Sequence, residues 1–122
     1  YMTTFHRAIT TFSVSDIETA LDFWTQIMEF TVAFTKGNPV CFAILNRDTV
    51  DVHINLNPET AGSGRCHIVV EGLDAVYESC MAGGITIKQP PTVQSWGFRD
   101  LLICDSDGNT LEIAEDISNL QM

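Results

Sequence analysis

The sequence predicts an α+β fold of two βαβββ modules, because helical and strand patterns occur twice in the same order. Apolar residues recur at helical spacing in two segments, and each segment is flanked by runs in which apolar and polar residues alternate. The two halves are offset by about 58 residues, so that Asp16 falls on Asp74. The 122 residues are about the size of one domain. We therefore expect a single domain over 1–122, with module one at about 5–57 and module two at about 65–117.

The first helix is expected to begin with a capping box, Ser15-Asp16-Ile17-Glu18, in which Ser15 and Glu18 satisfy free backbone amides reciprocally. The second helix is expected to end at Gly83-Gly84, a favourable C-cap. Each helix has one apolar stripe: Ile17, Ala20, Leu21, Trp24, Ile27 and Met28 in the first, and Leu73, Val76, Tyr77, Cys80 and Met81 in the second. Such stripes favour packing against a sheet.

Strands are expected before and after each helix. The expected ranges are 5–13, 31–36, 39–45 and 49–56 in the first half, and 65–71, 85–88, 98–104 and 109–115 in the second. Turns at 37–39, 46–48 and 105–108 join the later strands as hairpins. Alternation along these strands predicts that one face of each sheet packs on its helix. The other face is polar and carries His53, His67 and Glu112, so we expect the functional site there.

Composition excludes several classes of partner. Six basic residues against sixteen acidic ones give a net charge of −10, which disfavours binding to nucleic acid or to a membrane surface. No apolar run reaches the roughly 18 residues of a membrane-spanning helix, and residues 1–4 lack the pattern of a signal peptide. The four cysteines have no metal-ligand spacing and are expected to be reduced. We therefore expect a cytoplasmic protein.

Several motifs together resemble the vicinal-oxygen-chelate superfamily. They are Val14-Ser15-Asp16-Ile17 followed by Phe23-Trp24, then His67-Ile68-Val69-Val70 with Leu73 to Tyr77 and Gly84-Ile85, and finally Trp96-Gly97-Phe98-Arg99 with Asp105 to Ile113. Ser106 stands where proline is usual. The superfamily includes glyoxalase I, extradiol dioxygenases, fosfomycin-resistance enzymes and bleomycin-resistance proteins. The resemblance covers nearly the whole chain and implies half-barrel modules in a homodimer, with cavities between the subunits.

The resemblance also implies four positions for metal ligands. Metal-using members place them on the first and last strands of each module, and the matching positions here are Ile9, His53, His67 and Glu112. His53, His67 and Glu112 form a sufficient set for a divalent metal, namely Fe, Mn, Ni or Zn. Ile9 cannot bind a metal. Glu112 is also the candidate catalytic residue, as a ligand or as a base that moves a proton alpha to a carbonyl.

A second group of residues is expected to contact an organic ligand. Trp96 offers a flat apolar surface in the region where drug-binding relatives stack aromatic groups on planar ligands, and Arg99 is a candidate partner for an anionic substituent. Asn55, Ile9 and Thr11 complete the expected ligand-binding set. Trp96 could equally serve only to cover its hairpin.

Two functions follow from these expectations. The first is non-catalytic binding of a small organic molecule, such as an antibiotic, in a dimer cleft without a cofactor. The alternative is a metal-dependent lyase, isomerase or dioxygenase that uses His53, His67 and Glu112. Whether the protein is an enzyme stays open at this point. A module that only mediates assembly is a third reading, which the polar face disfavours.

Overall fold

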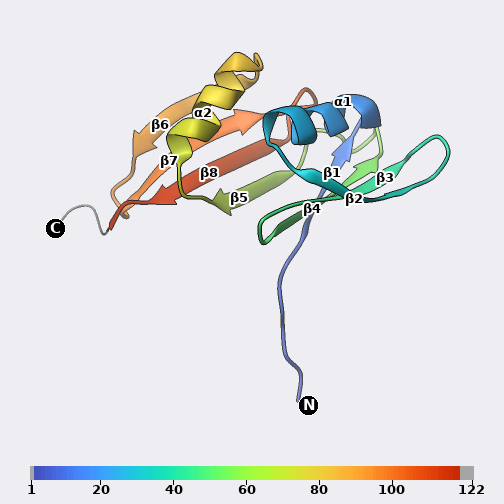
Figure 1. Ribbon diagram of the computed structural model, residues 1–122, viewed down its shortest axis with the longest axis horizontal. Helices are drawn as coiled ribbons and strands as arrows, with labels where there is room; N and C mark the ends of the chain where they lie inside the picture. The colour runs from blue at the N-terminus through green and yellow to red at the C-terminus, as the bar shows by residue number, and fades with distance from the viewer. Residues whose placement is uncertain (1, 119–122) are drawn as a thin grey trace.

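The computed structural model describes residues 2–118, and in it two four-stranded sheets lie side by side (Figure 1). Module 1 consists of β1 (Thr10–Val14), α1 (Ile17–Asp22), the π-helical turn η1 (Phe23–Ile27), β2 (Thr31–Lys36), β3 (Phe42–Arg47) and β4 (Val50–Leu56). Module 2 consists of β5 (Arg65–Val69), α2 (Leu73–Ala82), β6 (Thr86–Val93), β7 (Phe98–Cys104) and β8 (Thr110–Asp116). This arrangement confirms the predicted α+β fold.

The two sheets have the same topology. Their strand orders are β1-β4-β3-β2 and β5-β8-β7-β6. In each sheet the first strand pairs in parallel with the last, and the remaining pairs are antiparallel. The parallel pairs bring Thr11 opposite His53 and His67 opposite Glu112. The chain therefore repeats one βαβββ design, as the 58-residue offset predicts.

Both helices lie on the same side of the two sheets (Figure 1). The apolar residues of the alternating strand pattern face the helices. The buried side chains form a single cluster that runs through both modules. Its most buried members include Trp24, Leu45, Ile54, Leu101, Ile103 and Ile113. We call the opposite side of each sheet its open face. It carries Thr11, Ile44 and His53 in module 1, and His67, Leu102 and Glu112 in module 2.

The predicted capping box is wrong in its details. Asp16, not Ser15, is the N-cap of α1, and its carboxylate accepts hydrogen bonds from the backbone N–H groups of Glu18 and Thr19. Ser15 is instead bonded to Asp107 in the β7–β8 turn, through both its backbone N–H (3.0 Å) and its hydroxyl. The sequence pattern places two cap-forming side chains next to each other, and a contact 92 residues away decides between them.

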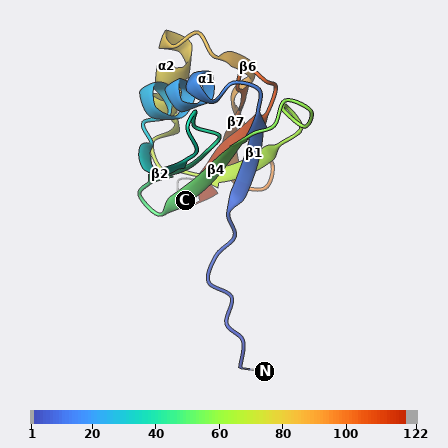
Figure 2. The same ribbon diagram turned by 90° about the vertical axis from the view of Figure 1, so that its right-hand side faces the viewer.

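Strand β1 also begins later than predicted. It starts at Thr10, which lies opposite Val52 of β4 and is the first residue of β1 in the register of the two strands. Residues 2–9 extend away from the sheets in both views (Figure 1, Figure 2), and the side chain of Phe5 is 94% exposed. Smaller differences affect β3, which starts at Phe42, β5, which ends at Val69, and β6, which continues to Val93. None of them changes the face on which a predicted site residue of these strands lies.

Asn109 joins the two modules. Its amide nitrogen donates to the backbone carbonyl of Ser13 and to Asp105 (both 2.9 Å), and its amide oxygen accepts from the backbone N–H of Gly64 (2.8 Å). The residue is only 2% exposed. A Cβ atom on Gly64 would lie 2.5 Å from the ring of Phe12, so glycine is required for this close approach. The junction thus depends on one buried amide and one missing side chain.

We predict that Asn109→Ala lowers the free energy of unfolding by about 2 to 3 kcal/mol, because it removes three hydrogen bonds and leaves partly buried backbone groups without partners. Urea unfolding followed by far-ultraviolet circular dichroism measures the change. The matched control is Asn46→Ala on β3, whose side chain has no protein hydrogen bond within residues 2–118. Equal stability of the two variants would contradict the role given to Asn109.

All four cysteines are free, as predicted, and they differ in their surroundings. Cys80 lies fully buried on α2, and burial raises the pKa of its thiol to about 11, because the thiolate loses its hydration there. Cys41, in contrast, is partly exposed ahead of β3.

We predict that Cys80 in the native protein resists alkylation by iodoacetamide at pH 8. A rise in pKa from 9.0 to about 11 lowers the thiolate fraction at this pH roughly a hundredfold, and burial hinders the reagent as well. Mass spectrometry of digested protein after timed labelling should show Cys41 modified first. Labelling of Cys80 at the rate of Cys41 in folded protein would contradict the predicted burial.

Candidate functional site

The open face of module 1 combines one imidazole with apolar side chains. His53 on β4 lies opposite Ile44 and next to Phe42, both on β3. The Phe42 and His53 rings meet edge to face, with their centroids 5.3 Å apart. Phe34 on the neighbouring strand β2 is 51% exposed on the same face. This surface therefore offers exposed aromatic area together with a group that can donate or accept a hydrogen bond.

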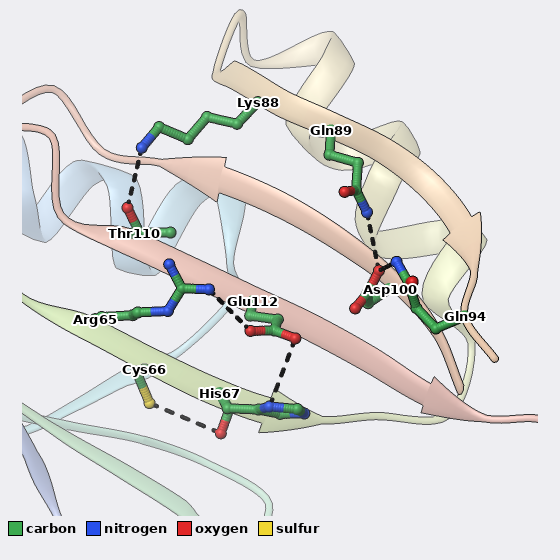
Figure 3. A network of polar contacts seen from close by, with 9 residues as sticks. All are labelled: Arg65, Cys66, His67, Lys88, Gln89, Gln94, Asp100, Thr110 and Glu112. Atoms are coloured by element: carbon green, nitrogen blue, oxygen red, sulfur yellow. Dashed lines mark hydrogen bonds and ion pairs between the residues drawn. The ribbon is translucent and has the colours of Figure 1, made fainter. Parts of the chain in front are cut away.

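The open face of module 2 holds a second imidazole beside a carboxylate (Figure 3). Nδ1 of His67 lies 3.7 Å from one oxygen of Glu112, and the other oxygen accepts a hydrogen bond from Arg65 at 3.1 Å. The Glu112 side chain is about one-fifth exposed, whereas that of His67 is half exposed. His67 also meets Phe98 edge to face, with a centroid separation of 6.5 Å. Each open face thus carries a pair of one histidine and one phenylalanine.

Further along the same face, Asp100 is buried without a cationic partner among the described residues. One oxygen of its carboxylate accepts hydrogen bonds from the side-chain amides of Gln89 and Gln94, both at 2.9 Å (Figure 3). Asp100 is 4% exposed. This network was not predicted, although an acidic residue in the largely apolar segment 98–104 is a signal for it.

The histidine–phenylalanine pairs were also missed. Strand parity could have placed both phenylalanines on the open faces. Phe42 lies opposite Asn55, which is two residues from His53 on the same face of β4. Phe98 lies four residues before Leu102, so both share one face of β7. The contact between Lys88 and the Thr110 hydroxyl, at 3.3 Å (Figure 3), had no such signal, since Lys88 sits at an irregularity in the pairing of β6 with β7.

Arg99 does not lie on the open face of module 2, where the functional site is expected. It shares the helix-facing side of β7 with Leu101 and Ile103. Its guanidinium donates a hydrogen bond to Asp74 in the first turn of α2. This contact and the charge of Asp74 raise the pKa of Arg99. Arg99 therefore connects α2 to its sheet.

The other residues of the expected ligand-binding set have different positions. Thr11 and Asn55 belong to the open face of module 1, through their register with His53 and Phe42. Ile9 precedes β1 and is 38% exposed. Trp96 lies in the turn between β6 and β7, where Gly97 has a φ of 88°, and it is 63% exposed. More than half of the Trp96 side chain is therefore exposed to solvent.

The expected metal ligands are brought together only in part. His67 and Glu112 are neighbours, but within residues 2–118 no group of three or more histidine, cysteine or acidic side chains is placed to hold a metal ion. The Glu112 carboxylate is also engaged by Arg65. The described residues of one chain therefore do not fit a three-ligand centre. Across the same residues, no helix has the length and apolar character needed to cross a membrane.

Comparisons with known proteins agree with this architecture. Residues 6–113 match the sequence profile of the family described as "Glyoxalase/Bleomycin resistance protein/Dioxygenase superfamily". A bleomycin resistance protein of Geobacillus stearothermophilus is 26% identical, over 93% of this chain and 98% of that protein.

Two solved structures are similar in fold. TnmS3, an antibiotic binding protein from Streptomyces sp. CB03234, has a TM-score of 0.78 at 23% identity, covering 95% of this chain and 99% of TnmS3. The bleomycin resistance determinant encoded on the transposon Tn5 has a TM-score of 0.76 at 20% identity, covering 92% of this chain and 98% of the determinant.

We predict that Arg99→Gln changes the free energy of unfolding by only about 0.2 to 1 kcal/mol, because its partner Asp74 is largely exposed and water screens the pair. A double-mutant cycle with Asp74→Asn, measured by urea unfolding, isolates the interaction. The same Arg99 variant should leave any ligand binding at the open faces unchanged. Loss of ligand affinity in Arg99→Gln would return this residue to the binding site.

Proposed function

The chain belongs to the Glyoxalase/Bleomycin resistance protein/Dioxygenase superfamily, and on this premise we propose that it binds a small organic molecule against the open faces of its sheets. The observation that carries the proposal is the histidine–phenylalanine pair on each open face: Phe42 with His53, and Phe98 with His67. The bleomycin resistance proteins and the antibiotic binding protein similar to this chain support an antibiotic as the kind of ligand.

The chemistry of the pairs suits a planar ligand with polar substituents. Aromatic rings stack on or meet the edges of other rings with a gain of about 0.5 to 1.5 kcal/mol beyond simple burial. Each imidazole can in addition donate or accept a hydrogen bond, which fixes the orientation of the ligand. Trp96, in the turn just before Phe98, is exposed and offers a further aromatic ring.

The charge of the open faces narrows the class of ligand. By strand register, four acidic residues (Asp51, Asp100, Glu112 and Asp116) and three basic residues (Lys36, Arg65 and Lys88) lie on these faces. The faces therefore account for one unit of the net charge of −10, and the rest of the chain for nine. This distribution supports a neutral or weakly charged ligand, although the chain as a whole is strongly acidic.

We further propose that a second copy of the chain covers the open faces, so that the ligand lies in a cleft between two subunits. Neither open face is covered by a helix of its own chain (Figure 1). Large apolar side chains are exposed on them, with Phe34 at 51% and Val69 at 58%. Burial of this apolar surface against a second copy is favourable at roughly 25 cal/mol per Å².

Binding can be tested with bleomycin and a panel of planar antibiotics, followed by the fluorescence of Trp96. The second tryptophan, Trp24, is buried in the core and serves as a constant background. We expect saturable binding that Phe42→Ala and Phe98→Ala each weaken about two- to tenfold, through lost ring contacts. The control is Met81→Ala, an exposed apolar position on α2. Binding that both phenylalanine variants retain in full would contradict the proposal.

The alternative function, a metal-dependent lyase, isomerase or dioxygenase, is favoured by the contact between His67 and Glu112. Because one chain does not bring three ligands together, such a centre would require His53 of a second copy. We expect protein purified without chelator to contain no stoichiometric Fe, Mn, Ni or Zn by elemental analysis. Metal at one equivalent per chain that is lost in both His53→Ala and His67→Ala would contradict non-catalytic binding and support a metal-dependent enzyme.

A further inference from the structure

A crevice of about 570 Å³ lies between the two modules on the side of the helices. Apart from Val69, the residues that line it are not used by the proposed function. Small-molecule sites in proteins usually have volumes of about 300 to 1,000 Å³ and predominantly apolar linings. The size of the crevice is therefore that of a binding site for one small organic molecule.

Each module supplies one wall. The wall from module 1 consists of 27–30, at the end of η1 and just after it, and 47–50, which are the β3–β4 turn and the strand residue on each side of it. The guanidinium of Arg47 donates a hydrogen bond to the backbone carbonyl of Met28 at 2.9 Å, which fastens these two segments together. The wall from module 2 consists of 68–72 with Ala75, Val76 and Ser79 of α2. Both walls are thus parts of regular elements or are tied to them.

The interior of the crevice is apolar. Met28, Phe30, Ile68 and Ile113 contribute to it and are each less than 8% exposed, so they belong to the core and have fixed positions. Val50 and Val76 lie at the edge of the same cluster. An apolar group that enters the crevice would be removed from water where it contacts these side chains, which is favourable at roughly 25 cal/mol per Å².

The rim is negative. Glu29, Asp48 and Glu71 line it together with a single basic residue, Arg47. Arg47 lies 3.9 Å from both Glu29 and Asp48, whereas no basic group of residues 2–118 lies within 4.0 Å of Glu71. Three carboxylates against one guanidinium give the rim a formal charge of −2. A concave surface lined by one sign of charge attracts the opposite sign.

We propose that this crevice is a second ligand site, specific for a small amphiphilic cation. The apolar body of the ligand occupies the interior, and its positive group lies at the rim beside Glu71. The site is independent of the proposed function, because it uses α2, the segment after η1 and the β3–β4 turn in place of the histidine–phenylalanine pairs.

The test uses two probes with the same tail and opposite charge, decyltrimethylammonium and decanoate, each below its micelle-forming concentration. Isothermal titration calorimetry of the full chain should show one saturable site for the cation and at least tenfold weaker binding of the anion. Ala75→Trp places a large side chain in the crevice and should weaken cation binding at least tenfold. Its matched control is Ala82→Trp, at the other exposed alanine of α2, which does not line the crevice and should bind as the parent does.

Charge and location are tested separately. Glu71→Gln should weaken binding of the cation about fivefold and leave binding of decanoate unchanged or stronger. Phe42→Ala and Phe98→Ala should leave cation binding unchanged, which separates a failure of this site from a failure of the proposed function. Equal binding of the two probes, or full binding in Ala75→Trp with a native melting curve, would overturn the proposal. Conversion of a dimer to a monomer by Ala75→Trp, seen by sedimentation, would also overturn it and identify a second copy as the occupant.

Discussion

The arrangement of the whole molecule depends on the buried amide of Asn109. Each module forms its own sheet, and the contacts between the modules set how the two open faces lie relative to each other. Asn109 connects the end of β1, the loop before β5 and the β7–β8 turn through three hydrogen bonds. Since it is almost completely buried, each of these bonds replaces one to water, and the loss of any one leaves a polar group unpaired. The buried amide of Asn109 therefore favours the one arrangement of the modules in which all three hydrogen bonds form.

Most of the fold follows from the period of the strands. A strand that alternates strictly has one possible assignment of its faces, and the register of Val52, His53 and Ile54 is fixed by the need to bury the two apolar side chains. The same argument places His67 and Glu112 on one face of module 2, where they are direct neighbours. The sequence alone therefore predicts the face of the sheet on which these residues lie, without any information on tertiary contacts.

The failures have a different origin, because they concern contacts between distant segments. The cap of α1 depends on Asp107, and the extent of β1 depends on its pairing with β4, 42 residues further along the chain, which begins at Thr10 opposite Val52. The side on which Arg99 lies was missed for another reason: Arg99 was interpreted as part of a motif, although its parity with Leu101 places it on the helix side. Convergence of three metal ligands is likewise a property of tertiary structure, and strand parity alone places His53 and His67 on equivalent faces of two separate sheets.

The duplication explains why the two sides of the molecule differ in chemistry. On the helix side, each module must bury an apolar surface under its own helix, so the residues between the modules are apolar as well, and a crevice remains where the two helices do not meet. On the open side, no helix requires apolar contacts, and polar residues such as His53, His67 and Glu112 are tolerated in the strands. The walls of the crevice come from both modules, so a ligand bound between them would stabilise one relative position of the modules. The same position sets the relation between the two open faces, so the junction at Asn109 physically links both surfaces.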